Sequence, residues 1–137
     1  MSSIPRLFLP DDLVIQIGGY ARNCLPLEAC GLVAGTENRA VAFLPVSNEL
    51  QSPSEFRMDP QEQLNAFLWM EKQHLDLLAI FHSHPQGPQT PSTTDIAEFF
   101  YPGVTSLIWT PVSLRAFDIT REGYTEVPVT LNEASNG

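Results

Sequence analysis

The sequence predicts an α/β fold in which helices cover the faces of a β-sheet. Two segments with apolar residues at helical spacing begin near Pro10 and Asp59, and apolar runs of strand length lie between and after them. Such an alternation of helices and strands is typical of an α/β sheet. The length of 137 residues favours a single domain over residues 1–137, with a core at about 10–130 and a frayed tail at 130–137.

The first part of the chain predicts a helix followed by a hairpin. Residues 10–12 (Pro-Asp-Asp) form a helix-start signal ahead of apolar residues that recur at helical spacing to about Asn23. Residues 29–34 and 40–46 are mostly apolar, and we expect two strands joined by a hairpin loop at 36–39.

The middle of the chain predicts a polar loop and a second helix. Residues 47–57 are polar, so we expect a loop with a short strand near 55–58. Asp59 and Pro60 then start a helix that ends near His74. The helix is expected to turn one stripe toward the sheet, formed by Leu64, Phe67, Leu68 and Glu71.

The rest of the chain predicts a strand at 77–82, a proline-rich loop, a short helix and three further strands. The helix is expected from Ser92 to Phe100, because Pro102 and Gly103 halt it. Apolar, β-branched and aromatic residues predict the three strands, at residues 104–109, 114–119 and 124–129.

Three residues near the loop at 83–91 have the chemistry of metal ligands. Alternate side chains of a strand point to the same face, so His82 and His84 project together. Asp95 lies in the first turn of the next helix, from which it can reach back toward the strand end. Two imidazoles and one carboxylate form a ligand set that suits zinc and leaves a fourth position for water.

Each part of this pattern also has a purely structural explanation. A His-x-His pair at a strand end is more often a polar surface feature than a pair of ligands. Ser92 with Asp95 is typical of a helix cap. The combination favours a metal site, because a cap does not require a neighbouring His-x-His pair.

The pattern resembles the signature of the JAMM (MPN-plus) metalloproteases: His-x-His, seven residues, Ser-x-x-Asp, and a glutamate far upstream. Residues 26–35, which contain Glu28, resemble the family's glutamate segment, and residues 45–48 and 56–60 are similar to small stand-alone prokaryotic members. The resemblance covers about residues 10–120. It implies a curved mixed β-sheet flanked by helices, the JAMM/MPN fold, which is similar to the cytidine-deaminase architecture.

The resemblance implies a zinc-dependent peptidase or isopeptidase that hydrolyses an amide bond at the C-terminus of a ubiquitin-like protein. His82, His84 and Asp95 would bind Zn²⁺, Glu28 would assist the attack of the zinc-bound water as general acid/base, and Ser92 would donate a hydrogen bond to the oxyanion. The small prokaryotic members imply a sulfur-carrier substrate, whose tail would pair with a sheet edge near residues 47–58. From its position alone, Glu28 is more typical of an exposed residue at a strand end.

Two alternatives to the peptidase stay open. One is a catalytically silent MPN-type scaffold that binds protein partners, and the other is a RadC-like protein associated with DNA repair, whose histidine loop is similar. The net charge of −9, from sixteen acidic and seven basic residues, would repel a nucleic-acid backbone, so we expect no nucleic-acid partner.

The remaining predictions concern the cellular location, the two cysteines and individual aromatic and polar residues. The chain shows no signal-peptide pattern and no apolar stretch long enough to cross a bilayer, so we expect a cytoplasmic protein without membrane partners. Cys24 and Cys30 are expected to be reduced and packed, with a mutual disulfide as the alternative. Trp69 and Trp109 are interpreted as core or groove wall. Ser47 and Asn48 lie in a segment that resembles the family, which makes both candidates for substrate binding. The oligomeric state, the substrate's identity and the metal bound in the cell stay open.

Overall fold

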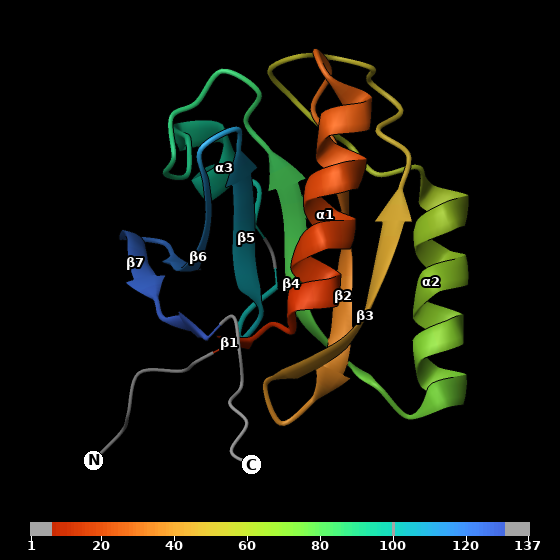
Figure 1. Cartoon of the computed structure of the whole chain (residues 1–137). Helices are drawn as coiled ribbons and strands as arrows, with labels where there is room; N and C mark the ends of the chain where they lie inside the picture. Colours follow the sequence, from red (N-terminus) through yellow and green to blue (C-terminus); the bar gives the residue numbers. More distant parts are fainter. Residues whose placement is uncertain (1–6, 100, 131–137) are drawn as a thin grey trace.

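A computed structural model describes residues 7–99 and 101–130, which form an eight-stranded mixed sheet and three helices (Figure 1). The elements occur in the order β1 (Leu7–Phe8), α1 (Asp11–Cys24), β2 (Cys30–Thr36), β3 (Arg39–Val46), α2 (Pro60–Gln73), β4 (Asp76–Ser83), α3 (Thr93–Ala97), β5 (Thr105–Thr110), β6 (Ser113–Thr120), β7 (Gly123–Val127) and β8 (Val129–Thr130).

The sheet is mixed and strongly curved. The strand order is β7-β6-β5-β4-β2-β3-β1-β8. The β4–β5 pair and the two pairs made by β1 are parallel, whereas the other neighbours are antiparallel. Pro128 alone separates β7 from β8, although these strands end the order at opposite sides, so the sheet must curl until its two edges come close. The expectation of a curved mixed sheet flanked by helices is confirmed.

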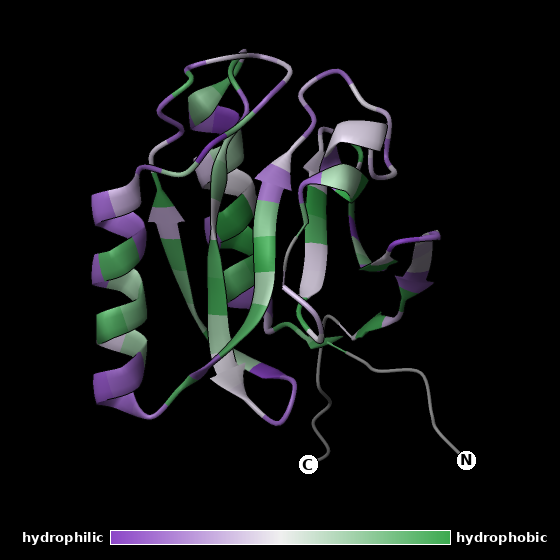
Figure 2. Ribbon diagram, turned by 180° about the vertical axis from the view of Figure 1, so that it is seen from behind, coloured by the Kyte–Doolittle hydropathy of each residue, from purple (hydrophilic) through white to green (hydrophobic). Residues whose placement is uncertain are grey.

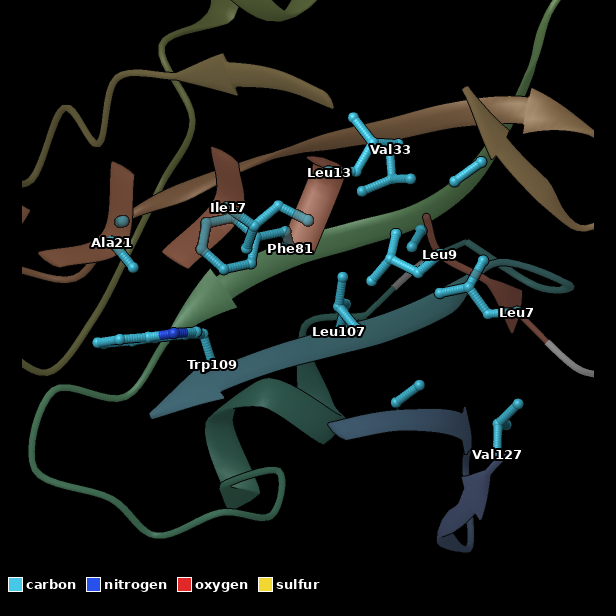
Figure 3. Packing of buried hydrophobic residues seen from close by; sticks show 14 residues of the cluster. Leu7, Leu9, Leu13, Ile17, Ala21, Val33, Phe81, Leu107, Trp109 and Val127 are labelled. Carbon is cyan, nitrogen blue, oxygen red and sulfur yellow. The ribbon is translucent and has the colours of Figure 1, made fainter. Parts of the chain in front are cut away.

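Helix α1 covers one face of the sheet. It lies in front of the central strands in Figure 1, and its apolar side packs into the core drawn in Figure 3. Leu13 and Ile17 of the helix meet Phe81 of β4 and Leu107 of β5, all of them buried. Burying each such side chain contributes about 1.5–3 kcal/mol. The core also holds Trp109, as expected.

Helices α2 and α3 cover the other face, but α2 does so with different residues than its pattern predicted. Ala66 and Met70 are the buried residues of α2, whereas Leu64 and Leu68 are 50% and 54% exposed. Trp69, interpreted as core or groove wall, is 40% exposed. The predicted stripe was therefore right for Phe67, which packs against the core, but wrong for Leu64, Leu68 and Glu71. The apolar residues of α2 go nearly all round the helix, so their spacing alone could not choose the buried side.

Three other expectations need correction. Helix α3 ends at Ala97, because Phe99 leaves the helix to pack between the clusters around Ile80 and Phe117. The short strand near 55–58 is a single bridge between Asn48 and Met58. The short strand β1 was not predicted, and the single strand predicted at 124–129 is divided at Pro128 into β7 and β8.

The expected tail from residue 130 is also partly wrong, because Thr130 belongs to β8 and pairs with Phe8 of β1. The rest of that tail, 131–137, lies outside the described residues. Cys24 and Cys30 are both free thiols, as expected. Within the described part of the chain, no helix has the length and hydropathy needed to cross a membrane.

Candidate metal centre

The two histidines are positioned by the end of the central strand β4. Strand β4 pairs with β2 on one side and with β5 on the other. The pairing extends to His82, which lies opposite Cys30 of β2 and Ile108 of β5. His84 lies just beyond the strand, where its N–H donates to the Trp109 carbonyl at 2.8 Å. Figure 2 shows β4 as hydrophobic along its length and hydrophilic at its tip. Both imidazoles therefore stand on a rigid, well-paired backbone.

The side chain of Ser83 points away from the histidines, as the strand alternation predicts. Its Oγ accepts a hydrogen bond from the Ala29 N–H at 2.8 Å, and its N–H donates to the Ala29 carbonyl at 2.9 Å. These bonds extend the β2–β4 contact by one residue toward Glu28. The segment that carries Glu28 is thereby tied to the strand end that carries the histidines.

Asp95 reaches the histidines from the first turn of α3. A capping box fixes this turn: Ser92 Oγ accepts from the Asp95 N–H at 3.0 Å, and Asp95 Oδ2 accepts from the Ser92 N–H at 2.9 Å. The same Oδ2 lies 3.2 Å from His82 Nε2 and 3.0 Å from His84 Nε2, and the two Nε2 atoms are 3.1 Å apart. Ser92 is therefore the cap of this helix, as its pairing with Asp95 in the sequence indicated.

These three atoms have the spacing of ligands to one cation. Ligands about 2.0–2.1 Å from a tetrahedral zinc lie about 3.3–3.4 Å from one another, which is close to the edges of the observed triangle. Acceptor atoms this close repel one another unless a proton or a cation lies between them. Among the described residues, His82, His84 and Asp95 form the group of histidines, cysteines and acids that could hold a metal ion.

Neighbouring groups orient both rings. His84 Nδ1 lies 2.7 Å from the Pro88 carbonyl, so Nδ1 carries the proton it donates, and the neutral ring then has its lone pair for a metal at Nε2. The ring of His82 stacks on Phe56, with centroids 4.6 Å apart and planes inclined by 19°. Its Nδ1 is buried and has no hydrogen-bond partner, so packing holds this ring.

Burial and mutual contact shift the pKa values of the three groups. Burial lowers the pKa of His82 below 6.5 against the opposing effect of Asp95. Burial also lowers the pKa of His84, but the hydrogen bonds to Asp95 and Pro88 outweigh it and raise the value. The hydrogen bonds from both imidazoles overcome the effect of burial on Asp95 and hold its pKa well below the usual range. Asp95 is therefore an anion beside the two rings.

Glu28 is buried next to this cluster. Only 5% of the residue is exposed, and its Oε1 has no hydrogen-bond partner. Burial raises the pKa of the Glu28 carboxyl from 4.5 to about 8, with His84 opposing the rise and Asp95 adding to it. The carboxyl group therefore senses two of the three predicted ligands, His84 and Asp95, and the alternative of an exposed strand-end glutamate is wrong.

A pocket of about 740 Å³ opens beside the cluster. Ser92, His82 and Asp95 lie in its lining, together with apolar and aromatic residues and two further acids. These other lining residues include Phe56, Met58, Ile80, Phe99, Tyr101, Glu55 and Glu98. Because Ser92 Oγ only accepts in the capping box, its hydroxyl hydrogen is free to donate toward the pocket.

Sequence reasoning missed the roles of Phe56 and Pro88, and it misjudged Asn48. Phe56 has no local signal, since only the folded loop brings it against His82. The Pro88 carbonyl is a backbone group, which no side-chain pattern reveals. Asn48 was considered for substrate binding, but its side chain bonds only to the backbone of this chain.

Comparison with known proteins gives consistent results. Residues 10–121 match the family model described as prokaryotic homologues of the JAB domain. A CysO-cysteine peptidase of Mycobacterium tuberculosis is 32% identical over 134 residues, which cover 93% of this chain and 92% of that enzyme. A desampylase of Pyrococcus furiosus is 43% identical over 70 residues, which cover 51% of this chain and only 50% of that protein.

Solved structures share the fold. A protein of Desulfitobacterium hafniense, solved in solution, superposes with a TM-score of 0.83 at 34% identity, and the match covers 95% of both chains. A structure described as a metalloprotease-like zinc site in the proteasome and signalosome superposes with a TM-score of 0.61. Its identity is 18%, over 93% of this chain and 99% of that one, so it supports the architecture alone.

Proposed function

The chain belongs to the family of prokaryotic homologues of the JAB domain, and we propose that it is a JAMM-type zinc metallopeptidase or isopeptidase. Its substrate would be an amide bond at the C-terminus of a ubiquitin-like protein of the sulfur-carrier type. The names of two relatives, a CysO-cysteine peptidase and a desampylase, support this substrate class. The observation that carries the proposal is the buried Glu28 beside three convergent metal-ligand atoms.

His82, His84 and Asp95 would hold the zinc through the two Nε2 atoms and Oδ2. When bound, zinc supplies a Lewis acid that lowers the pKa of a coordinated water and polarises a carbonyl group. The Pro88 carbonyl keeps the His84 ring in the tautomer that ligation needs. Stacking on Phe56 fixes the His82 ring and shields it from solvent.

Glu28 is the proposed general acid/base. Before a cation binds, the pKa of its carboxyl group is about 8, which is above the usual value of a glutamate. A cation nearby would lower this value, which brings the carboxyl group toward the range in which it can both accept and release a proton near neutral pH. Glu28 would take a proton from the attacking water at a carboxylate oxygen and deliver it to the departing amine.

Ser92 is the proposed hydrogen-bond donor to the carbonyl oxygen. The capping box fixes its Oγ in the pocket lining and leaves its hydrogen available. A fixed donor of this kind stabilises the negative charge that develops on the carbonyl oxygen and is worth about 2.7–4 kcal/mol of barrier.

The pocket suits an extended tail. Residues 54–58 form one of its walls, and only the bridge between Asn48 and Met58 pairs this loop in β fashion, so a substrate strand could add to it. Arg57 also lies in the lining, but it is paired with Glu49, so Glu55 and Glu98 favour a tail or leaving group that carries a positive charge.

The test uses a ubiquitin-like carrier that carries a C-terminal amino-acid extension. Zinc-loaded wild-type protein is expected to release the extension, which mass spectrometry detects as a loss from the carrier. Glu28→Gln is expected to cleave at least about 100-fold more slowly, because it cannot take up the proton. Glu71→Gln, a matched change at an exposed position of α2, should cleave like the wild type.

Equal cleavage by wild type and Glu28→Gln would exclude the assigned role of Glu28. A chelator is expected to abolish the activity, and zinc is expected to restore it. Protein that retains no metal and cleaves nothing would favour the silent scaffold, against which the intact ligand set argues. DNA binding at moderate salt would favour the RadC-like alternative, which the net charge of −9 opposes.

A further inference from the structure

Asn48 lies just after β3, and its side-chain amide is fully used within the protein. Its Nδ2 donates to the carbonyl of Glu28 at 3.2 Å and to that of Glu55 at 2.9 Å. Its Oδ1 accepts from the N–H of Leu50 at 3.1 Å and from that of Arg57 at 3.0 Å. An amide has two donor hydrogens and one acceptor oxygen with two lone pairs, so nothing remains to bind a substrate.

The two ends of this amide serve different purposes. The bonds to Oδ1 close the loop 49–57 on itself, together with the Glu49 N–H, which donates to the Arg57 carbonyl at 2.9 Å. The bonds from Nδ2 instead join this loop to the backbone of Glu28. A second bond crosses the same gap, since the Glu28 N–H donates to the Ser52 carbonyl at 2.8 Å.

The loop that Asn48 closes also forms one wall of the pocket. Residues 54–58 line the pocket, and Phe56 among them stacks on the His82 ring. Glu28 itself precedes β2 and therefore lacks the ladder bonds that hold the strand behind it. The bonds between Ala29 and Ser83 hold the next residue, but the N–H and the carbonyl of Glu28 itself are held by the Ser52 carbonyl and by Asn48. Asn48 is the side chain that connects Glu28 to the loop.

We propose that Asn48 is a positioning residue that holds Glu28 and the pocket wall 54–58 in one fixed arrangement. A substrate gripped by the wall is then placed correctly for the Glu28 carboxyl group. This inference rests on the proposed function for its catalytic meaning, but the mechanical connection is testable without any substrate.

Asn48→Asp tests the donor end of the amide separately from its acceptor end. The aspartate keeps acceptors for the Leu50 and Arg57 N–H groups, but it places an oxygen opposite the carbonyls of Glu28 and Glu55. Asn48→Ala removes all four bonds without adding a charge. Asn65→Asp is the matched control, because Asn65 is exposed on α2, adds the same charge and lies outside the pocket lining.

Amide hydrogen exchange, read by NMR, tests the connection directly. The Glu28 N–H donates to the Ser52 carbonyl across the gap that Asn48 also bridges, so loss of the Asn48 bonds should weaken it. In Asn48→Asp the Glu28 amide is therefore expected to exchange about tenfold faster than in Asn65→Asp, while the Leu50 and Arg57 amides stay protected. In Asn48→Ala all three amides should exchange faster. Unchanged protection of the Glu28 amide in both variants at residue 48 would overturn the proposal.

Kinetics with the extended carrier provide the second measurement. Asn48→Asp is expected to lower kcat by about tenfold or more relative to Asn65→Asp, because Glu28 loses its position. A rise of KM with an unchanged kcat would mean that Asn48 supports only the pocket wall, and it would overturn the proposal. If the wild type cleaves no carrier, the proposed function fails. Hydrogen exchange still decides whether Asn48 connects Glu28 to the loop 49–57.

If the variants at residue 48 do not fold, exchange in the wild type decides. The Glu28, Leu50 and Arg57 amides are expected to open together, with protection factors within about threefold of one another. Protection of Glu28 that differs more than about tenfold from that of the two loop amides would overturn the proposal.

Discussion

Replacing Glu28 with glutamine is expected to stabilise the metal-free protein, and the gain is expected to grow as the pH rises. The carboxyl group is buried, its Oε1 has no hydrogen-bond partner, and its pKa is raised from 4.5 to about 8. Between these two values the folded protein keeps a proton that the unfolded chain releases. The wild type therefore loses stability as the pH rises from about 4.5 to about 8, and the loss is complete above that range.

The size of the effect follows from the two pKa values. Each pH unit between 4.5 and about 8 corresponds to about 1.36 kcal/mol, so the full cost of ionising Glu28 is about 5 kcal/mol. The cost is about 1 kcal/mol at pH 5 and nearly complete at pH 9. Glutamine resembles the neutral carboxyl group in shape and cannot ionise, so Glu28→Gln avoids this cost.

The assay is urea unfolding of chelator-treated protein at pH 5 and pH 9, for the wild type and Glu28→Gln. The difference in the free energy of unfolding between the two proteins is expected to increase by about 4 kcal/mol from pH 5 to pH 9. Glu71→Gln, which removes one acid at an exposed position of α2, is the control for the chemical change itself. A difference for Glu28→Gln that is the same at both pH values would refute the reasoning.

Three further predictions concern the metal, the oxyanion donor and the face of α2. Asp95→Asn should lose metal on dialysis and show no rise of Tm with added zinc, whereas wild type should gain about 2.7 kcal/mol at a zinc concentration 100 times its Kd. Ser92→Ala should lower kcat by about 100-fold and, through loss of the cap, lower stability by about 1 kcal/mol, measured by carrier cleavage and by urea unfolding; a loss of stability alone would exclude the oxyanion role. Met70→Ala should cost about 2–5 kcal/mol of unfolding free energy, but Leu68→Ala less than about 1 kcal/mol, because Met70 is 3% exposed and Leu68 is 54% exposed; equal losses would contradict the observed orientation of α2.

The convergence of His82, His84 and Asp95 was predictable because its geometry is mostly local. Strand alternation places His82 and His84 on one side, and the first turn of the following helix presents Asp95. The hairpin at residues 36–39 was also predictable, since this short segment separates two apolar runs of strand length. The structure agrees, because Glu37 and Asn38 adopt the positive φ values of 51° and 67° that a tight hairpin turn needs.

The face of α2 and the ends of the sheet were not predictable from local pattern. Leu64 and Leu68 are as apolar as the residues that α2 buries, and only the position of the sheet decides between them. Strand β1 has two residues, too few for any periodic signal, and it exists because β3 and β8 pair with it from either side.

The sequence by itself determined the chemistry of this protein: two imidazoles, a carboxylate and a serine at spacings that a strand, a loop and a capped helix turn bring to one place. Only the tertiary structure decided the state of Glu28, fifty-four residues before His82, because burial is a property of everything that packs around a group. The β2–β4 contact and the loop held by Asn48 carry that carboxyl group out of water and beside the histidines, and this desolvation raises its pKa.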